Sequence, residues 1–189
     1  MLLPFDFRLR EAWDDPVIAL KRGDAVLTEL FRGALTSTAS LTRVLEESWG
    51  GPVRVRLERQ RVQEELPEDG LLWGECHHLS GPGRFLLRDA WLGHGETEGM
   101  FAHSEMRVEG LSPAVLSEVN RGQSPLGLLF PEEGKRVRRL ALQVTRGDSV
   151  QLTTRLGLPG PCPFWCRRSL FCVDETVVAR IFELFPREW

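Results

Sequence analysis

The chain has 189 residues, a formal net charge of -3 at pH 7 and a pI near 5.9. This charge lacks the strongly basic footprint of a nucleic-acid-binding protein. Hydrophobic residues make up 42% of the chain, which is enough for one compact domain, and we expect a single domain over residues 1–189. The sequence shows neither an apolar run near the roughly 20 residues that cross a bilayer nor a signal-peptide pattern. We therefore expect a cytoplasmic protein that binds neither nucleic acid nor membranes.

The four cysteines form no CxxC pair, and thiols stay reduced in the cytoplasm. Cys76 with His77 and His78, or Cys162 with Cys166, could ligate zinc. The spacings that are typical of tetrahedral zinc sites are missing, however. We therefore expect no metal site and no cofactor.

The first elements that the sequence predicts are helices. Apolar residues recur at helical spacing from residue 16 to residue 35, with an interruption at Gly23-Asp24, which indicates two short helices. The run from Leu41 to Leu45 resumes the pattern after a polar connection, and Gly50-Gly51-Pro52 ends it. A sheet should begin after this stop.

Strand patterns fill the middle of the chain. Apolar and charged residues alternate almost strictly from Val53 to Val62, which predicts a strand with one solvated face. Further strands are expected at 71–79, 84–92 and 99–108, separated by turn signals at 67–70, 80–83 and 93–95. These connections are too short for parallel crossovers, so the sheet should be antiparallel.

The last third of the chain returns to mixed patterns. Ser112-Pro113 and Ser124-Pro125 can each begin a short helix, and a strand is expected at 137–144. Residues 167–173 and 176–182 favour β-structure and flank Asp174-Glu175, which predicts a closing hairpin. The predicted fold class is α+β, with a single antiparallel β-sheet and helices packed against one face.

Glu183 departs from the pattern of this hairpin. Alternation places it on the same strand face as Val177, Ala179 and Ile181. A buried carboxylate is costly unless another group pairs with it or it keeps its proton. Glu183 is therefore a candidate for a functional group.

Several segments, in their order and spacing, resemble the chorismate lyase family, which comprises the bacterial chorismate-pyruvate lyases and their looser relatives. They are SLTRVL at 40–45, FLLRDAWL at 85–92, GMFAHSEM at 99–106, GQSPLGLLF at 122–130, and the pair CRRSLFCV and RIFELFP between residues 166 and 186. The resemblance implies a chorismate lyase-like fold with an enclosed site for an aromatic acid. It also implies a cofactor-free elimination of pyruvate from chorismate that leaves 4-hydroxybenzoate.

The resemblance also implies roles for individual residues. Arg88 matches the arginine that grips the carboxylate of the aromatic acid, and Glu183 matches the carboxylate near the hydroxyl of the product. Where the bacterial enzymes carry a second arginine, this chain has His103. The expected catalytic residues are Arg88 and Glu183, and the expected substrate-binding residues are Arg88, His103 and Glu183.

The chemistry of these side chains fits a carboxylate ligand. The planar fork of arginine is suited to holding a carboxylate, and a glutamate kept partly protonated by burial could protonate a departing ether oxygen. Without the resemblance, Arg88 would be a solvated residue of the strand's wet face, and Glu183 would be a charge that protects an edge strand. Arg167 and Arg168 would most simply lie on the hairpin surface, although one of them could form a salt bridge at the site.

Two classes of function remain open from the sequence. The first is a carbon–oxygen lyase that acts on chorismate or on a related small cyclic acid. The second is a non-catalytic protein on the same fold that holds an aromatic acid, a biosynthetic intermediate or a peptide. Both classes imply a small-molecule carboxylate as the first ligand to test, and neither fixes the oligomeric state.

Overall fold

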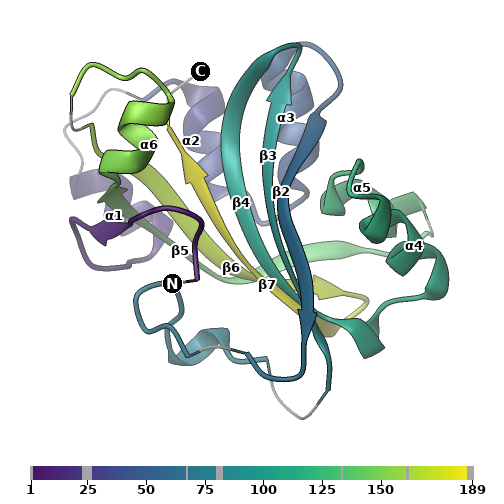
Figure 1. Ribbon diagram of the computed structural model, residues 1–189. Helices are drawn as coiled ribbons and strands as arrows, with labels where there is room; N and C mark the ends of the chain where they lie inside the picture. The colour runs from purple at the N-terminus through teal and green to yellow at the C-terminus, as the bar shows by residue number, and fades with distance from the viewer. Residues whose placement is uncertain are drawn as a thin grey trace.

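The computed structural model describes residues 2–22, 27–66, 68–79, 83–132, 134–160 and 162–186. Within these ranges one sheet of seven strands has the order β1-β5-β6-β7-β4-β3-β2, and every pairing is antiparallel (Figure 1). The strands are β1 (Arg8–Leu9), β2 (Arg54–Gln63), β3 (Phe85–His94), β4 (Thr97–Arg107), β5 (Val137–Asp148), β6 (Phe164–Val173) and β7 (Thr176–Phe185). The helices are α1 (Pro16–Arg22), α2 (Glu29–Thr36), α3 (Leu41–Trp49), α4 (Pro113–Arg121), α5 (Leu126–Glu132) and α6 (Val150–Arg155).

The predicted closing hairpin forms the centre of the sheet. β6 and β7 pair with each other, β7 also pairs with β4, and β6 also pairs with β5. Asp174 and Glu175 have φ values of 43° and 72°, so both central residues of the turn are left-handed, as in the tight turns that suit the twist of a hairpin. The predicted α+β class with one antiparallel sheet is confirmed.

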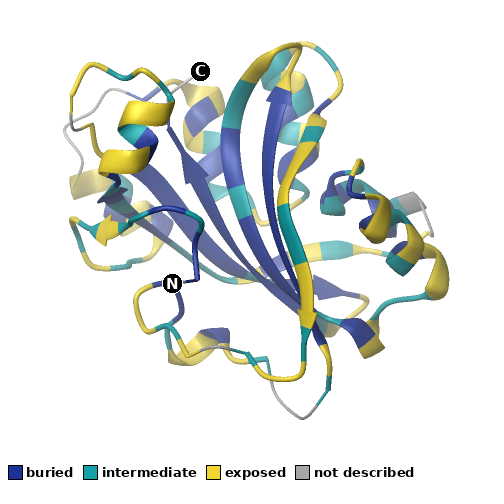
Figure 2. Cartoon of the chain, in the orientation of Figure 1, coloured by how far each residue is buried: buried dark blue, intermediate teal, exposed yellow. Residues whose placement is uncertain are grey.

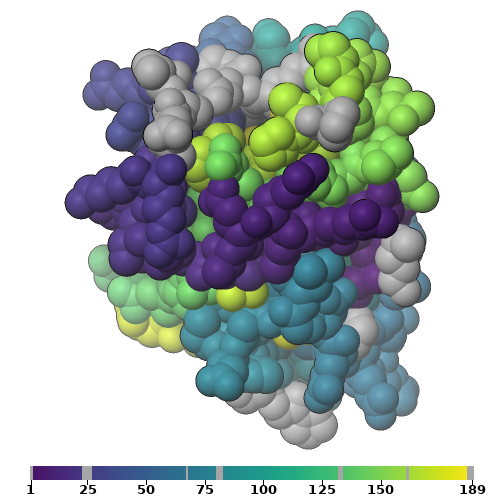
Figure 3. Space-filling model, turned by 90° about the vertical axis from the view of Figure 1, so that its left-hand side faces the viewer, coloured from purple at the N-terminus to yellow at the C-terminus, as the bar shows by residue number. Residues whose placement is uncertain are grey.

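Two layers cover the two faces of the sheet. We call the face under helices α1 to α5 the helix face. The opposite face is covered by the N-terminal segment, by the connection between β2 and β3, and by α6, whose Leu152 is 1% exposed. Figure 3 shows the N-terminal segment crossing this side between α6 and the connection. The sequence predicted the helices of the helix face but not α6.

The expected strand at 71–79 is wrong. This segment forms turns and a short 3₁₀ helix (Glu75–His77) within the connection that covers the sheet. Leu72 and Trp73 are buried, so the segment contributes apolar side chains to the core without pairing its backbone to a strand. The interruption expected at Gly23-Asp24 and most of the turn expected at 80–83 lie outside the described residues.

The inner strands are buried on both faces (Figure 2). Every residue of β3 from Phe85 to Gly93 is buried, whereas β2 at the sheet edge alternates between exposed and partly buried positions. A charged residue between Phe85 and Gly93 of β3 is therefore buried whichever way it points. Its partners then decide its protonation state and what it can bind.

Candidate functional site

A small pocket lies on the helix face, between the sheet and the first turns of α3 and α5. Its lining includes three charged residues that come from β3, β5 and β7, namely Arg88, Arg139 and Glu183. The remaining lining residues are apolar or small: Leu41, Thr42, Ala90, Leu92, Ala102, Ser104, Pro125, Leu126, Gly127 and Ile181. The room for water is about 40 Å³, which is enough for only a few water molecules. A concave, largely apolar pocket with a few convergent charges is the usual form of a small-molecule site.

Arg88 reaches this pocket from the middle of β3 and is 4% exposed. Its Nη2 donates to the carbonyl oxygens of Gly122 and Ser124 at 3.4 and 3.1 Å. No carboxylate pairs with it in the described part of the chain, and its Nε has no hydrogen-bond partner there. Burial lowers the pKa of Arg88 to about 10, so it still carries its charge at neutral pH. Among the residues that the structure describes, Arg88 is thus a buried cation without a counterion.

Glu183 lies in β7, with Arg167 on the adjacent strand β6 and Arg139 on β5, one strand further away. Arg139 Nη2 is 2.9 Å from Glu183 Oε1, and Arg167 Nε donates to Oε2. Burial alone would raise the pKa of Glu183, but the two guanidiniums outweigh it and hold the pKa below its usual value. Glu183 is therefore ionised, and the hypothesis that burial keeps it partly protonated is not supported. It can accept a hydrogen bond or a proton, but it does not carry a proton to donate.

Arg167 holds the carboxylate of Glu183 in place from beneath α2. It is fully buried, and its Nη1 donates to the carbonyl oxygens of Ala34 and Ser37 at the carboxyl end of α2. A cation at this end of a helix is favoured by the helix dipole. The expectation of a surface position is wrong for Arg167, and its alternative, a salt bridge to the site, is what the structure shows.

Arg139 was not singled out by the sequence analysis. It is 7% exposed, its Nη1 donates to Ser169 Oγ at 3.0 Å, and its guanidinium lies 5.0 Å from the centre of the Phe171 ring. The adjacent Arg138 is exposed and pairs with Glu175. Two successive arginines in one strand leave open which of them points inward, so alternation alone could not identify Arg139.

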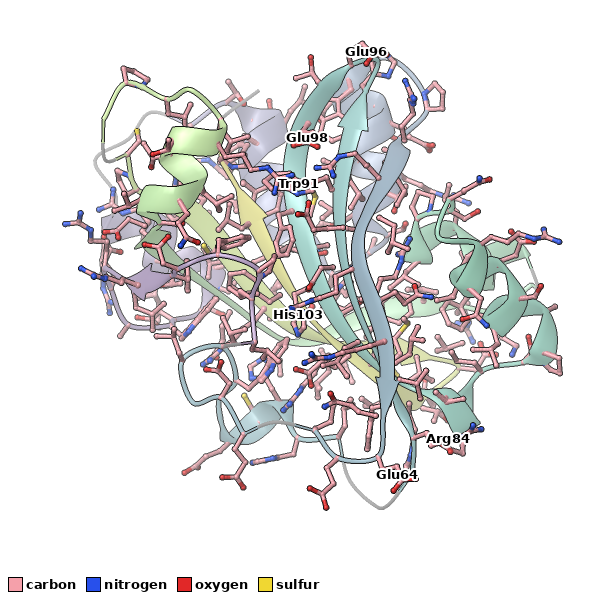
Figure 4. The ribbon with its side chains drawn as sticks, viewed as in Figure 1. Glu64, Arg84, Trp91, Glu96, Glu98 and His103 are labelled. Carbon is pink, nitrogen blue, oxygen red and sulfur yellow. The ribbon has the colours of Figure 1, made fainter. Side chains whose placement is uncertain are left out.

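His103 does not reach the pocket. It lies in β4 on the face opposite the helices, where it is fully buried (Figure 4). Its Nδ1 is 2.5 Å from Asp89 Oδ1, and its Nε2 is 3.2 Å from Glu105 Oε1. Burial favours the neutral imidazole, but the two carboxylates outweigh it and raise the pKa of His103. The substrate contact that was expected for His103 is therefore not among the contacts that the structure shows.

A chain of alternating charges continues on both sides of His103. Arg59 of β2 pairs with Asp89 at 2.7 Å, and Arg180 of β7 pairs with Glu105 at 2.6 Å. We call these five residues the ionic chain. Trp73 adds a hydrogen bond from its Nε1 to Glu105 at 3.1 Å, which ties the connection between β2 and β3 to the sheet. The ionic chain links four strands beneath the pocket, on the far face of the sheet.

Comparison with known proteins now gives the family. The family described as chorismate pyruvate-lyase Rv2949c-like matches residues 35–189. The chain belongs to this family. The match covers the pocket residues Arg88, Arg139 and Glu183. It confirms the resemblance that the sequence segments indicated. The comparison with curated proteins finds no match.

Solved structures with a similar fold include a ligand-binding domain of a transcriptional regulator and the protein PhnF with its effector domain. The effector domain of PhnF from Mycobacterium smegmatis has a TM-score of 0.55 at 12% identity, covering 78% of this chain and 88% of that one. The ligand-binding domain of a protein assigned to the GntR family of regulators, from Bordetella bronchiseptica, has a TM-score of 0.54 at 12% identity, covering 70% and 85%. Complete PhnF from Mycobacterium smegmatis has a TM-score of 0.54 at 12% identity, covering 76% and 62%. At this identity the likeness shows the fold alone.

Within the described residues, no helix is long and apolar enough to cross a membrane.

Proposed function

We propose that this member of the chorismate pyruvate-lyase family eliminates pyruvate from chorismate, or from a closely related cyclic acid, in the pocket of Arg88 and Glu183. The observation that carries the proposal is the buried guanidinium of Arg88, which has no carboxylate partner among the described residues and shares one pocket with an ionised glutamate. A ligand carboxylate would supply the counterion that Arg88 lacks. A bidentate arginine–carboxylate pair is among the strongest neutralising contacts available in such a site.

In this elimination the ring carbon–oxygen bond to the enolpyruvyl group breaks, and its electron pair leaves on the oxygen. A proton leaves the neighbouring ring carbon, and the ring becomes aromatic. The products are 4-hydroxybenzoate and the enolate of pyruvate, which regains the proton released from the ring to give the enol and then the keto form. Because aromatisation drives the reaction, the protein mainly orients the substrate and stabilises charge as it develops.

Arg88 and Glu183 fit two different tasks in this scheme. Arg88 would hold the ring carboxylate and so fix the position of the ring. Glu183 is ionised, so it would accept a hydrogen bond from the ring hydroxyl or take up the departing ring proton, rather than protonate the ether oxygen. This assignment changes the role that the sequence suggested for Glu183 and keeps its place in the site.

A second candidate function is ligand binding without turnover. The ionised state of Glu183 favours it, because the carboxylate that the sequence proposed as a proton donor has no proton to give. The fold is also shared with the ligand-binding domain of a GntR-family regulator and with the effector domain of PhnF. On this alternative the pocket would hold an aromatic acid as a signal or an intermediate.

One experiment separates the two candidates. Purified protein is incubated with chorismate, and pyruvate release is followed by reduction with lactate dehydrogenase and NADH, while calorimetry follows 4-hydroxybenzoate binding. Turnover that is lost in Arg88→Gln supports the lyase. Binding of 4-hydroxybenzoate without pyruvate release supports the binding protein. If the wild-type protein neither releases pyruvate nor binds the acid, both proposals fail.

A further inference from the structure

The charges around the pocket do not balance. Arg88, Arg139 and Arg167 are all buried. Among the described residues, Glu183 is the only carboxylate that forms an ion pair with any of these three arginines. Burying a charge is expensive unless a partner compensates it. One glutamate compensates one guanidinium, so the three arginines leave an excess of two positive charges. The pocket is therefore prepared for more negative charge than a single ligand carboxylate supplies.

The excess charge is located at two separate positions. The Nε groups of Arg88 and Arg139 are both buried, and neither has a hydrogen-bond partner within the described ranges. Both arginines line the pocket, one from β3 and the other from β5. These strands are not neighbours, because β6, β7 and β4 lie between them in the sheet. The two cations therefore approach the pocket from different sides.

We infer that Arg139 is a second anion-binding residue of this pocket and selects ligands that carry a second acidic group besides the one held by Arg88. The inference rests on the proposed function and adds to it the residue that recognises the second acid. In the proposed reaction this second acid is the carboxylate of the enolpyruvyl group. Arg139 would hold the departing fragment while Arg88 holds the ring.

Arg139 is better placed for this task than Arg167. Arg167 does not line the pocket, and its guanidinium is already bound to Glu183 and to two carbonyl oxygens at the end of α2. Both arginines keep one buried donor without a partner among the described residues, Nε in Arg139 and Nη2 in Arg167, but of the two only Arg139 lines the pocket. Burial lowers the pKa of Arg139 to about 10, and the charge of Arg167 contributes to this shift. An anion beside Arg139 would offset both the burial of its charge and the repulsion from Arg167.

The simpler interpretation is that Arg139 only stabilises the fold. It pairs with Glu183 and packs on Phe171, and both contacts would hold β5 to the centre of the sheet without any ligand. A purely structural arginine would affect all ligands of the pocket alike. An anion-binding arginine would affect only ligands that carry the second acid. The two interpretations therefore predict different ratios between the affinity for a ligand that carries the second acid and the affinity for a ligand that lacks it.

Two stable probes measure this ratio. The first, 3-(carboxymethoxy)benzoate, has a ring carboxylate and an ether-linked second carboxylate, and the second, 3-methoxybenzoate, keeps the ring carboxylate and the ether but lacks the second acid. Calorimetric titration of the full chain with each probe gives the preference for the second acid. We expect the wild-type protein to bind the dicarboxylate at least ten times more tightly. Arg139→Gln should reduce this preference to less than threefold and leave the affinity for 3-methoxybenzoate within threefold of wild type.

Arg138→Gln is the matched control, since it removes the neighbouring arginine whose side chain is exposed and pairs with Glu175. It should leave both affinities unchanged. A wild-type protein that binds the two probes equally overturns the inference whether or not Arg139→Gln folds, and the proposed function then still stands. An equal loss of both probes in folded Arg139→Gln also overturns it, because it indicates a structural role. If the wild-type protein binds neither probe, the inference fails, while pyruvate release from chorismate and 4-hydroxybenzoate binding decide the proposed function separately.

Discussion

Arg88 and Asp89 are neighbours in β3, but their side chains serve opposite faces of the sheet. Arg88 lines the pocket, and Asp89 is 2.5 Å from His103 in the ionic chain. Directly across the strand pair, Ser104 Oγ donates to the carbonyl oxygen of Arg88 at 3.4 Å. The ionic chain therefore anchors, from the far face, the same strand that presents Arg88 to the pocket. The residues of the far face act on the site through the position of β3.

Replacing Arg88 by methionine should separate binding from stability. We expect Arg88→Met to weaken 4-hydroxybenzoate binding by about 2–5 kcal/mol, the range for removing one side of a buried charge pair. The free energy of unfolding should stay the same or rise, because the variant removes a buried charge that lacks a counterion. Calorimetric titration and urea denaturation measure the two effects. Arg61→Met, at an exposed position of β2, is the control and should change neither by much.

Glu183 should make a pH-dependent contribution to stability. Its folded-state pKa lies below the ordinary value of 4.5, so its stabilisation is complete above that value and is lost as the pH falls through the folded pKa. We expect Glu183→Gln to lower the free energy of unfolding at pH 7 by about 3–5 kcal/mol, the range for breaking a buried ion pair. This difference in the free energy of unfolding between the variant and the wild-type protein should become smaller as the pH falls. Urea denaturation between pH 3 and pH 7 measures it, and a deficit that stays constant with pH would contradict an ionised Glu183.

The control for this measurement is Glu175→Gln. Glu175 also pairs with an arginine, Arg138, but its side chain is 78% exposed. Exposed pairs contribute little, so this variant should lie within about 1 kcal/mol of wild type at pH 7.

His103 should stabilise the protein in the opposite pH direction. Its folded-state pKa lies above the ordinary value of 6.5, so its stabilisation is complete below that value and is lost as the pH rises through the folded pKa. We expect the contribution of His103 to the free energy of unfolding of the wild-type protein to fall as the pH rises above 6.5, and His103→Gln to remove this fall. His94→Gln, at the exposed end of β3, should keep it. Because His103 lies outside the pocket, its pKa should not set the pH dependence of 4-hydroxybenzoate affinity, and a dependence that disappears in His103→Gln would show otherwise.

Gly127 should set how closely α5 approaches α3. A Cβ at this position would lie 2.6 Å from Thr42 Oγ1 and 2.9 Å from Ser40 Oγ. We therefore expect Gly127→Ala to force α5 outward and lower the free energy of unfolding by about 1–3 kcal/mol, as for other overpacked positions. Gly33→Ala in α2 is the control, because its Cβ would meet open space and should stabilise the helix by about 0.5–1 kcal/mol. Thermal and urea denaturation of the two variants should give opposite signs.

The sequence could predict Arg88 and Glu183 because each one interrupts an apolar strand at a position that the family resemblance marks. It could not show whether His103 lies on the same sheet face as Arg88 and Glu183, since this depends on the register in which β4 pairs with β3 and β7. In the structure Ser104 lies opposite Arg88 and Ala102 lies opposite Glu183, so the residue between them points away. Registers of this kind are fixed by tertiary pairing between strands that are distant in sequence.

Periodicity and turn residues in the sequence could predict most helices and strands. They gave a wrong prediction where an apolar segment is buried against the sheet without pairing its backbone to a strand. The segment around Trp73 has the apolar content of a strand, yet it covers the sheet as a loop. The sequence did not identify Arg139 for another reason, which is an irregularity in β5. This strand has a bulge between Leu140 and Gln143, where Ala141 has a positive φ of 50°. A bulge changes which side chains face inward, and no periodic pattern records it.

The narrowness of the pocket has a consequence for the time course of binding. The room for water is smaller than an aromatic ring, so we expect the segment from Pro125 to Gly127 and the first turn of α3 to part when a ligand binds. Opening then precedes occupancy, and the association rate should level off at high ligand concentration at the rate of opening. Stopped-flow mixing with 4-hydroxybenzoate should show this plateau through the tryptophan fluorescence. Dissociation must wait for the same opening, so a ligand once enclosed should leave slowly even when its equilibrium affinity is modest.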